Sequence, residues 1–290
     1  SCSFCAIPSF KGKLHSRTLE SLVKEVTNLV KKGYKDFSFV SQDSSSYLRD
    51  LGHNDGLEQL IDAVEKIDGV KTARILYLYP STTTLNLIDK IADSKVFVNY
   101  FDMPLQHISQ NMLKIMKRGK GAEKLIELMN YMRSKPNSFV RTTFIAGHPG
   151  ESEEDFEELC SFVEEFGFDR GNVFSYSDEE GTSAETRDDK IEQELIDERA
   201  EILGDIISQT TIKSLENDIG KSFEVYIDGE SEEHEYLLSA RKTIWAPQID
   251  GEIYINDNED NIPIVFGEIY EVEATQLAGD KLLAKIIRKV

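Results

Sequence analysis

Phe139-Val-Arg-Thr-Thr-Phe-Ile145, followed by Gly147-His-Pro-Gly-Glu151, is the most informative segment of this chain. Its aromatic and β-branched residues predict a buried strand, and the Gly and Pro close behind them predict a turn. Residues 152–166 then carry apolar side chains at helical spacing. The segment is therefore typical of one strand–turn–helix unit of a parallel α/β protein.

The same alternation continues on both sides of this segment. Strands are predicted at 37–40, 73–79, 96–101, 139–145 and 172–176, and helices at 16–32, 55–67, 84–93, 109–135 and 152–166. Ser16 or Thr18 can cap the first helix, and Gly33 can end it. Buried strands that alternate with amphipathic helices form parallel sheets, so the pattern predicts either an open sheet or a barrel.

Polar residues follow each predicted strand. They are Gln42-Asp43, Pro80, Gln106-His107, Gly147 to Glu151 and Ser177 to Gly181. Active groups of parallel α/β proteins lie where the strands end, so we expect these five clusters to share one rim of the sheet. Each cluster by itself is first of all a turn.

The last part of the chain has a different character. A long helix is predicted over 188–215, and after Gly220 come short strands at 223–228, 236–240, 252–256, 269–274 and 282–287. Short strands separated by turns suggest a small antiparallel barrel of the oligonucleotide-binding size class. We therefore divide the chain into a domain of residues 1–215 and a domain of residues 216–290.

The charge and composition narrow the possible partners. Acidic residues outnumber basic ones 53 to 33, which gives a net charge of −20. Such a surface repels phosphate backbones and attracts basic partners, although solubility alone also accounts for it. No apolar run is long enough to cross a bilayer, and three cysteines in 290 residues do not form a disulfide framework. We expect a cytoplasmic protein.

Two of the cysteines have the spacing of metal ligands. Cys2 and Cys5 lie three residues apart in a predicted loop, where both thiolates can reach one metal. Thiolate is the usual ligand of iron–sulfur clusters and of structural zinc. The pair alone leaves three readings open: part of a cluster site, half of a zinc site, or two ordinary thiols. Cys160 lies within an amphipathic helix and is expected in the core.

A series of motifs runs in order through nearly the whole chain. They are Cys2-Ser-Phe-Cys5-Ala-Ile-Pro8, Ser41-Gln-Asp43, Tyr77-Leu-Tyr79-Pro80, Met103-Pro-Leu-Gln106-His107, Met116 to Gly119, Gly147-His-Pro149-Gly-Glu151 and Tyr176-Ser-Asp-Glu-Glu180-Gly181-Thr182. This series resembles that of the radical S-adenosylmethionine (SAM) methylthiotransferases. The last 70 or so residues resemble the TRAM domain that closes these enzymes. The resemblance implies a partial parallel (β/α) barrel of the radical SAM type, followed by a small, OB-like antiparallel barrel.

The resemblance also implies cofactors and the residues that bind them. Three cysteines of the family hold a 4Fe-4S cluster, SAM binds its open iron, and a radical derived from SAM abstracts hydrogen from the substrate. Cys2 and Cys5 would be the second and third ligands, and Gln42 and Asp43 would lie near the amino group of SAM or near the substrate. The remaining predicted contacts are Gln106 and His107 below SAM, Arg141 and Thr142 at its carboxylate or ribose, and Gly147 and Tyr176 at its adenine. For His107 the alternative is a buried histidine that orients a loop.

The likeness is greatest to the RimO type of the family, which modifies an aspartate of a small-subunit ribosomal protein. The tRNA-modifying MiaB type usually has Arg-Pro-Gly where this chain has Glu179-Glu-Gly181. Residues 211–290 hold 17 acidic and 8 basic side chains, a balance of −9, which suits a basic protein and disfavours direct nucleic-acid binding. An electron donor such as a flavodoxin is implied as a further partner.

Two alternatives to a ribosomal-protein enzyme stay open. One is a tRNA-adenosine methylthiotransferase of the MiaB type, and the other is a non-catalytic protein-binding module. In the last domain, Trp245 is either a contact residue for the partner or part of the barrel core.

The beginning of the chain departs from the family pattern. The first cluster cysteine is expected four residues before Cys2, and the family's amino-terminal domain carries a second cluster. We therefore expect the chain as given to be inactive and to hold little or no iron–sulfur cluster. We also expect its sheet to have five parallel strands and an open edge.

Overall fold

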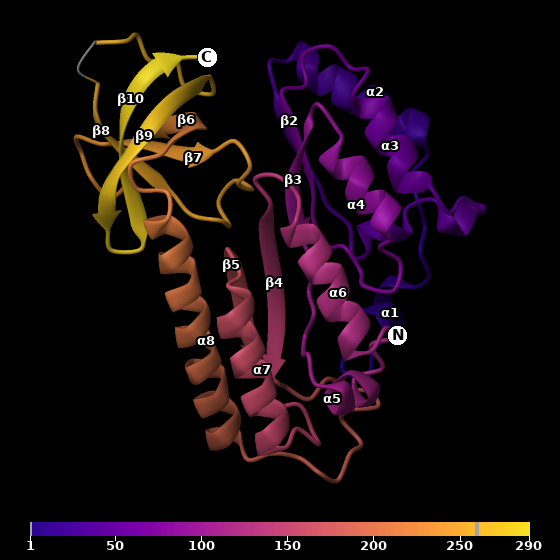
Figure 1. The fold of residues 1–290 in the computed structure, drawn as a ribbon. Helices are drawn as coiled ribbons and strands as arrows, with labels where there is room; N and C mark the ends of the chain where they lie inside the picture. The colour runs from indigo at the N-terminus through magenta and orange to yellow at the C-terminus, as the bar shows by residue number, and fades with distance from the viewer. Residues whose placement is uncertain (1, 259–260) are drawn as a thin grey trace. The chain divides into compact units, whose positions relative to one another are not determined.

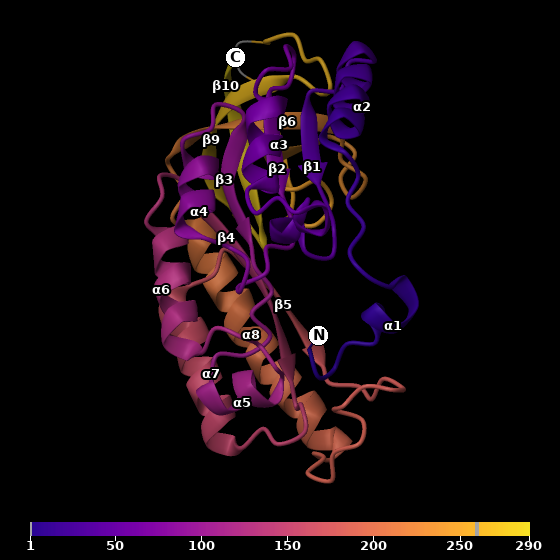
Figure 2. The same ribbon diagram turned by 90° about the vertical axis from the view of Figure 1, so that its right-hand side faces the viewer.

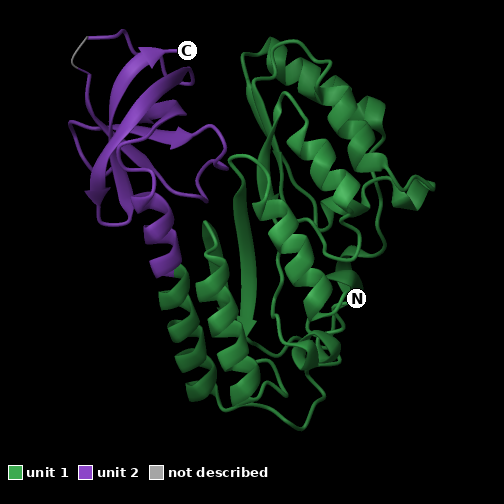
Figure 3. Cartoon of the chain, in the orientation of Figure 1, with its two compact units in different colours: residues 1–207 green, residues 208–290 purple. Residues whose placement is uncertain are grey.

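The computed structural model describes residues 2–258 and 261–290 (Figure 1). The chain forms two compact units, residues 1–207 and residues 208–290, coloured separately in Figure 3. The division falls inside one long helix, α8 (Gln193–Glu216). The domain boundary that we place after residue 215 stays a prediction.

The first unit is built on a parallel sheet. In the described residues it has five strands in the order β1-β2-β3-β4-β5: β1 (Asp36–Phe39), β2 (Thr72–Ile75), β3 (Phe97–Asp102), β4 (Phe139–Ala146) and β5 (Arg170–Ser175). Every pairing is parallel, with Phe37 opposite Ala73 and Ile145 opposite Phe174. The predicted partial β/α barrel with β1 at its edge is therefore confirmed.

Helices connect successive strands of this sheet. They are α3 (Gly56–Val64), α4 (Leu85–Ala92), α5 (Gln110–Ile115), α6 (Ala122–Arg133) and α7 (Glu153–Phe166). Before β1 come α2 (Leu19–Lys31) and the short α1 (Ile7–Lys11), which stands apart from the sheet in Figure 2. Two 3₁₀ turns, η1 (Ser44–Ser46) and η2 (Arg49–Leu51), follow β1. No helix in the described residues is both long enough and apolar enough to span a membrane.

The helices begin where side chains cap them. Thr18, rather than Ser16, caps α2, because its hydroxyl oxygen accepts the Ser21 N–H at 3.3 Å. The Ser16 hydroxyl oxygen instead accepts the Leu48 N–H at 2.9 Å. At α7, Ser152 and Asp155 form a capping box that satisfies two N–H groups of the first turn. This cap fixes where the helix starts after the turn that follows β4.

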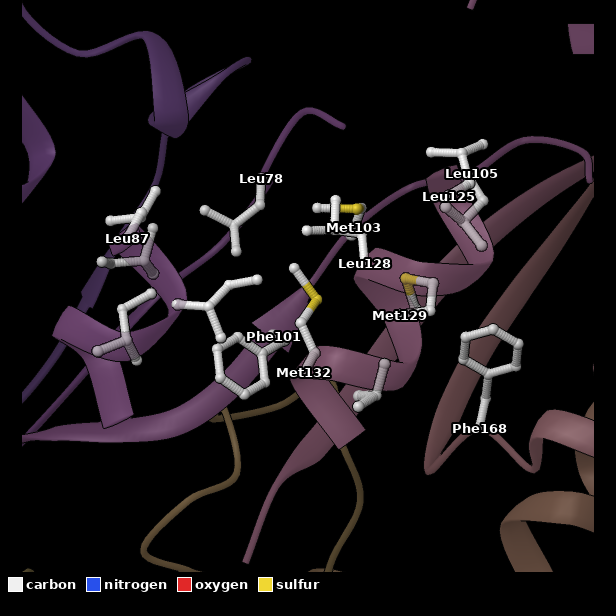
Figure 4. Packing of buried hydrophobic residues seen from close by; sticks show 14 of the residues in the cluster. Leu78, Leu87, Phe101, Met103, Leu105, Leu125, Leu128, Met129, Met132 and Phe168 are labelled. Carbon is white, nitrogen blue, oxygen red and sulfur yellow. The ribbon is translucent and has the colours of Figure 1, made fainter. Parts of the chain in front are cut away.

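Alternation along the strands separates a core face from a polar face. On β4, Val140 and Phe144 join the hydrophobic core, whereas Arg141 and Thr143 face the opposite side and line a cavity. Figure 4 shows the core side, where Phe101 of β3 lies beside Met132 and other apolar side chains of α6. The helices thus bury one face of the sheet and leave the other face for the site.

The second unit is a small closed barrel. Its strands are β6 (Ser222–Glu230), β7 (Leu238–Lys242), β8 (Ile253–Asp257), β9 (Ile269–Ala278) and β10 (Lys281–Lys289). Among the residues described, four pairings are antiparallel, and β10 pairs with β8 in parallel. The predicted small, OB-like barrel is therefore confirmed, and a parallel pair closes it.

Trp245 follows β7 and is 2% exposed. Its ring belongs to the interior of the barrel, so of the two predicted readings the core residue is correct and the contact residue is wrong.

Candidate functional site

A cavity of about 860 Å³ opens on the polar face of the sheet, within the first unit. All five strands contribute to it. Gln42 lies after β1, Tyr77 and Tyr79 after β2, Pro104 and Gln106 after β3, and Tyr176 and Glu179 after β5, whereas Arg141 and Thr143 lie within β4 itself. Its size is that of a pocket for a small ligand. The predicted shared rim is thus present, although only some of the predicted residues line it.

The loop that carries Cys2 and Cys5 is fixed to three distant parts of the chain through Ser3. The Ser3 N–H donates to the Met116 carbonyl oxygen at 3.0 Å, and the Ser3 carbonyl oxygen accepts the Ala184 N–H at 3.0 Å. The Ser3 hydroxyl lies 3.1 Å from Nε2 of His148. These contacts hold the cysteine loop beside the cavity, whose wall includes Phe4.

Both cysteines of this loop are free thiols and half-buried. Nη1 of Arg118 donates to Cys2 Sγ at 3.3 Å, and the Tyr79 hydroxyl lies 3.8 Å from the same sulfur. The Arg118 guanidinium lies over the Tyr79 ring, 4.6 Å from its centroid. One of the two predicted ligands therefore sits next to a fixed positive charge at the edge of the cavity.

Gln106 lies in the cavity wall with an unusual backbone conformation. Its φ of +73° lies in the left-handed region, which costs a non-glycine residue about 1 kcal/mol or more. Its N–H donates to the Thr143 carbonyl oxygen at 2.8 Å, and its carbonyl oxygen accepts the Ile145 N–H at 2.9 Å. Its buried Oε1 has no hydrogen-bond partner among the described residues. A ligand N–H in the cavity would satisfy that oxygen.

Arg141 is held by a buried carboxylate. Its Nη1 lies 3.2 Å from Oδ1 of Asp102, a residue that is fully buried, and Oδ2 of Asp102 accepts the Tyr77 N–H at 3.1 Å. Thr142 points to the other side of β4, where its hydroxyl donates to the Met103 carbonyl oxygen at 3.0 Å. Of these two neighbouring predicted residues, the structure brings only Arg141 to the cavity.

His107 is fully buried and does not line the cavity. Its Nδ1 accepts the N–H groups of Ile108 and Ser109, each at 3.0 Å, so in the neutral ring Nε2 carries the proton. Nε2 lies 3.6 Å from Oε2 of Glu151. These contacts favour the alternative reading, in which His107 orients the loop that carries Gln106.

Glu151 joins this loop to the one after β4. Both of its carboxylate oxygens accept the Gly147 N–H at 3.1 Å, and Arg199 of α8 donates to Oε1 at 2.9 Å. Gly147 has a φ of +80°, and a Cβ there would lie 2.5 Å from the Ile196 side chain. The only N–H of Gly147 is thus engaged by Glu151, and the residue does not line the cavity.

Tyr176 lies in the cavity wall beside His148. Its hydroxyl donates to Asp178 at 2.8 Å, and burial together with this carboxylate raises the pKa of Tyr176. Burial lowers the pKa of His148, so this ring is neutral near pH 7. Its edge-to-face contact with Tyr176, at 5.1 Å between centroids, is one that an aromatic residue makes. The neutral His148 ring therefore packs against Tyr176 as an aromatic side chain would.

Asp43 is also placed away from the cavity wall. Its carboxylate accepts the Ser46 N–H at 3.1 Å and the Ser45 hydroxyl at 2.7 Å, which caps η1. Four of the eight predicted cofactor residues therefore line the cavity (Gln42, Gln106, Arg141 and Tyr176), and four lie behind its wall (Asp43, His107, Thr142 and Gly147). The role of each toward a cofactor stays a prediction.

Tyr79 and Arg118, for which no role is predicted from the sequence, both line the cavity and contact Cys2. Both lie inside motifs that carry the resemblance, Tyr77 to Pro80 and Met116 to Gly119. The motifs therefore contain both residues, but Cys2 and Arg118 are separated by 116 in residue number, and no local pattern predicts that they are in contact.

The residues at this site have the chemical groups that an iron–sulfur cluster and SAM require. Cys2 and Cys5 supply soft thiolate donors, and Gln106 Oε1 offers an unmatched acceptor in a cavity of suitable size. Across residues 2–258 and 261–290, no group of three or more His, Cys, Asp or Glu residues forms a metal site. That Cys2 and Cys5 bind such a cluster stays a prediction.

Comparison with known proteins identifies the family of this chain. Residues 1–163 match the family model of the Radical SAM superfamily, and residues 219–287 match the TRAM domain. The chain is 79% identical, over 99% of its length, to a protein from Aliarcobacter butzleri named ribosomal protein uS12 methylthiotransferase RimO. It is 62% identical, over 99% of its length, to a protein of the same name from Sulfurovum sp.. The chain covers 65% of the length of each of these relatives.

A solved structure supports the fold. Coproporphyrinogen III oxidase (HemN) from Escherichia coli, described as a radical SAM enzyme, has a TM-score of 0.54 and 16% identity. The match covers 66% of this chain and 45% of that one. Because the family model covers more than half of the chain and the sheet has the arrangement seen in such a structure, this chain belongs to the Radical SAM superfamily.

Proposed function

We propose that this chain is the radical SAM and TRAM part of a methylthiotransferase that modifies an aspartate of ribosomal protein uS12. The observation that carries the proposal is the 79% identity, across 99% of the chain, to a protein named ribosomal protein uS12 methylthiotransferase RimO. The cavity supports it, because the cysteine loop and the carboxyl ends of five strands meet there. Action on a ribosomal protein also implies a cytoplasmic enzyme.

Within this proposal, Cys2 and Cys5 are ligands of a 4Fe-4S cluster, and the cavity holds SAM. The chemistry supplied by the bound pair is one-electron cleavage of a sulfonium and removal of hydrogen from the substrate carbon. An external one-electron donor such as a flavodoxin would supply the electron. The protein's part is to bind, orient and shield the reacting groups.

Three cavity residues have chemistry suited to SAM. The free Oε1 of Gln106 can accept an N–H from the amino group, and Arg141 can face the carboxylate while Asp102 fixes its guanidinium. The Tyr176 ring offers an aromatic wall for the adenine. Gln42 adds an amide at the opposite end of the sheet.

His107, Glu151 and Gly147 act behind this wall. Glu151 accepts the Gly147 N–H and faces Nε2 of His107, so one carboxylate joins the loops after β3 and β4. Because His107 also accepts two backbone N–H groups of its own loop, the position of Gln106 depends on this network. Their proposed role is to hold cavity residues in position, without contact to the substrate.

The charge of the second unit supports a basic protein as the substrate. Five of its basic side chains are paired with acidic ones: Arg241 with Asp228, Lys242 with Asp218, Lys281 with Glu233 and Glu252, Lys285 with Glu273, and Arg288 with Glu271. Cations engaged in this way are poorly placed to neutralise phosphates. A basic ribosomal protein is therefore a better partner for this barrel than tRNA.

The test uses the longer protein that contains this chain, loaded anaerobically with iron and sulfide. It is incubated with SAM and dithionite, in parallel with purified uS12 and with tRNA, and each product is analysed by mass spectrometry. We expect a methylthio mass increase on one uS12 aspartate, lost in Cys2→Ala and in Cys5→Ala. Cys160→Ala is the matched control, because this thiol lies on α7 outside the cavity, and it should retain activity.

Two results would contradict the proposal in different ways. Modification of tRNA with unmodified uS12 would make the substrate wrong while leaving the chemistry intact. Modification of uS12 at the wild-type rate by Cys2→Ala would remove the cysteine loop from the mechanism.

A further inference from the structure

Arg118 lies in the cavity wall, and its charged side chain donates a hydrogen bond to a predicted cluster ligand. Its Nη1 donates to Cys2 Sγ at 3.3 Å, and Nη2 donates to the Pro104 carbonyl oxygen. The guanidinium carbon lies over the Tyr79 ring, 4.6 Å from its centroid. Arg118 is only 8% exposed. Three separate contacts thus hold one charged group against the sulfur.

This arrangement is selective for one of the two cysteines. Cys2 Sγ also contacts the Tyr79 hydroxyl at 3.8 Å, so both of these polar neighbours of the sulfur come from outside its own loop. Lys117, the residue before Arg118, points elsewhere, with Nζ donating to the Ser183 hydroxyl at 2.9 Å. The positive charge at Cys2 therefore comes from Arg118 through a specific geometry and does not reflect a general cluster of cations.

A buried hydrogen bond to a ligand sulfur has a known consequence for iron–sulfur clusters. Reduction adds negative charge to the cluster, and that charge is partly carried by the thiolate sulfurs. A donor that is also a cation stabilises the reduced form more than the oxidised form, which raises the reduction potential. The effect is largest where water is excluded, and the low exposure of Arg118 meets this condition.

We propose that Arg118, held by Tyr79 and by the Pro104 carbonyl, donates a hydrogen bond to the Cys2 thiolate of the bound cluster and raises its reduction potential. The inference rests on the proposed cluster site. Arg118 acts here as a positioning and tuning residue that acts through Cys2. It makes the cluster easier to reduce for a protein electron donor.

The experiment is a redox titration of the iron-loaded longer protein, followed by electron paramagnetic resonance. The cluster in question is identified by the change that added SAM produces in its signal. The variants are Arg118→Gln, which removes the charge and the forked donor, and Arg118→Lys, which keeps the charge alone. Lys117→Gln is the matched control, because it removes one positive charge from the adjacent residue without touching Cys2.

We expect the reduced-to-oxidised ratio of Arg118→Gln, at a fixed applied potential, to fall about tenfold, which corresponds to a midpoint about 59 mV more negative. Arg118→Lys should shift in the same direction by a smaller amount, and Lys117→Gln should match the wild type. Tyr79→Leu, which removes the ring under the guanidinium, should also shift the midpoint negative. A purely structural role for Arg118 would lower iron content without moving the midpoint of the clusters that remain.

The outcomes separate this inference from the proposed function. A wild-type protein that takes up no iron would overturn both. A loaded protein that modifies uS12, but whose midpoint is the same in wild type, Arg118→Gln and Arg118→Lys, would overturn only the role of Arg118. If Arg118→Gln cannot hold iron, Arg118→Lys decides, and a midpoint equal to the wild-type value would refute the proposal.

Discussion

Replacement of Arg199 by alanine should strongly destabilise the first unit. Arg199 is 4% exposed and donates from Nη1 to the Glu151 carboxylate at 2.9 Å and to the Glu151 carbonyl oxygen at 3.1 Å. Its Nη2 donates to Glu153 at 2.8 Å. In the variant, Glu151 keeps its charge in a site where its side chain has no exposed surface.

The expected magnitude follows from this burial. Removing one partner of a buried ion pair costs roughly 3–5 kcal/mol, because the other charge is left uncompensated. The free energy of unfolding of a domain is roughly 5–15 kcal/mol, so the loss is a large fraction of it. The matched control is Arg17→Ala. Arg17 pairs with Glu25, but both side chains are about half exposed, and exposed pairs contribute about 1 kcal/mol or less.

The assay is urea unfolding followed by far-UV circular dichroism, which reports mainly the helices of the first unit. Arg199→Ala should lower the unfolding midpoint far more than Arg17→Ala does. The double variant Glu151→Gln/Arg199→Ala should recover part of the loss, because the amide oxygen can still accept the Gly147 N–H without a buried charge. Equal losses for Arg199→Ala and Arg17→Ala would refute the argument.

Three further predictions concern other parts of the chain. Gly147→Ala should lower the melting temperature, because a residue with a side chain pays about 1–2 kcal/mol for a φ of +80° and the new Cβ would lie 2.5 Å from Ile196. Adding Ile196→Ala should recover part of the loss. Burial raises the pKa of Cys160 to about 11, so iodoacetamide should alkylate it at pH 8.5 about a hundredfold more slowly than in urea, and equal rates would contradict the burial. The stabilising contribution of the neutral thiol is present below the pKa of the unfolded chain and is lost as the pH rises toward 11, which unfolding curves of Cys160→Ser as a function of pH would check. Trp245→Ala should destabilise the barrel by about 3–5 kcal/mol, whereas Tyr236→Ala, at a residue that is 90% exposed, should leave amide hydrogen exchange of the barrel unchanged.

The order and type of the secondary-structure elements could be predicted because each strand and helix has its own local pattern. The position where β2 ends could not be predicted in this way. The apolar run over 73–79 predicts a strand of seven residues, but β2 ends at Ile75. Tyr77 has a φ of +60°, and its N–H donates to Asp102 on the neighbouring strand. A tertiary contact therefore turns the chain toward the cavity after Ile75, and no local sequence pattern predicts this turn.

The closing of the barrel was also beyond local pattern. Short strands separated by turns predict antiparallel neighbours, and most pairings of the described barrel strands follow this rule. The parallel pairing of β10 with β8 depends on how the ends of the sheet meet in space. Sequence patterns predict which segments form strands, but they do not predict which two strands pair to close the barrel.

The segments that form the site were easier to predict than the individual side chains that line its cavity. Arg141 and Thr142 were both assigned to the cofactor, yet neighbouring residues of a strand point to opposite faces, and only Arg141 lines the cavity. His107 and Asp43 follow strands as expected, but their side chains satisfy backbone N–H groups of their own turns. Arg118 was missed because its importance lies in a contact with Cys2 that the fold creates.

The central claim is that the cysteine loop and the carboxyl ends of the sheet form one cofactor site. Calorimetric titration of SAM into the iron-loaded longer protein tests it most directly, with Cys2→Ala, Gln106→Ala and Cys160→Ala compared with the wild type. The account predicts that binding is lost in Cys2→Ala, is weakened in Gln106→Ala by about 1–3 kcal/mol, and is unchanged in Cys160→Ala. Wild-type affinity in both Cys2→Ala and Gln106→Ala would place SAM elsewhere and contradict the account.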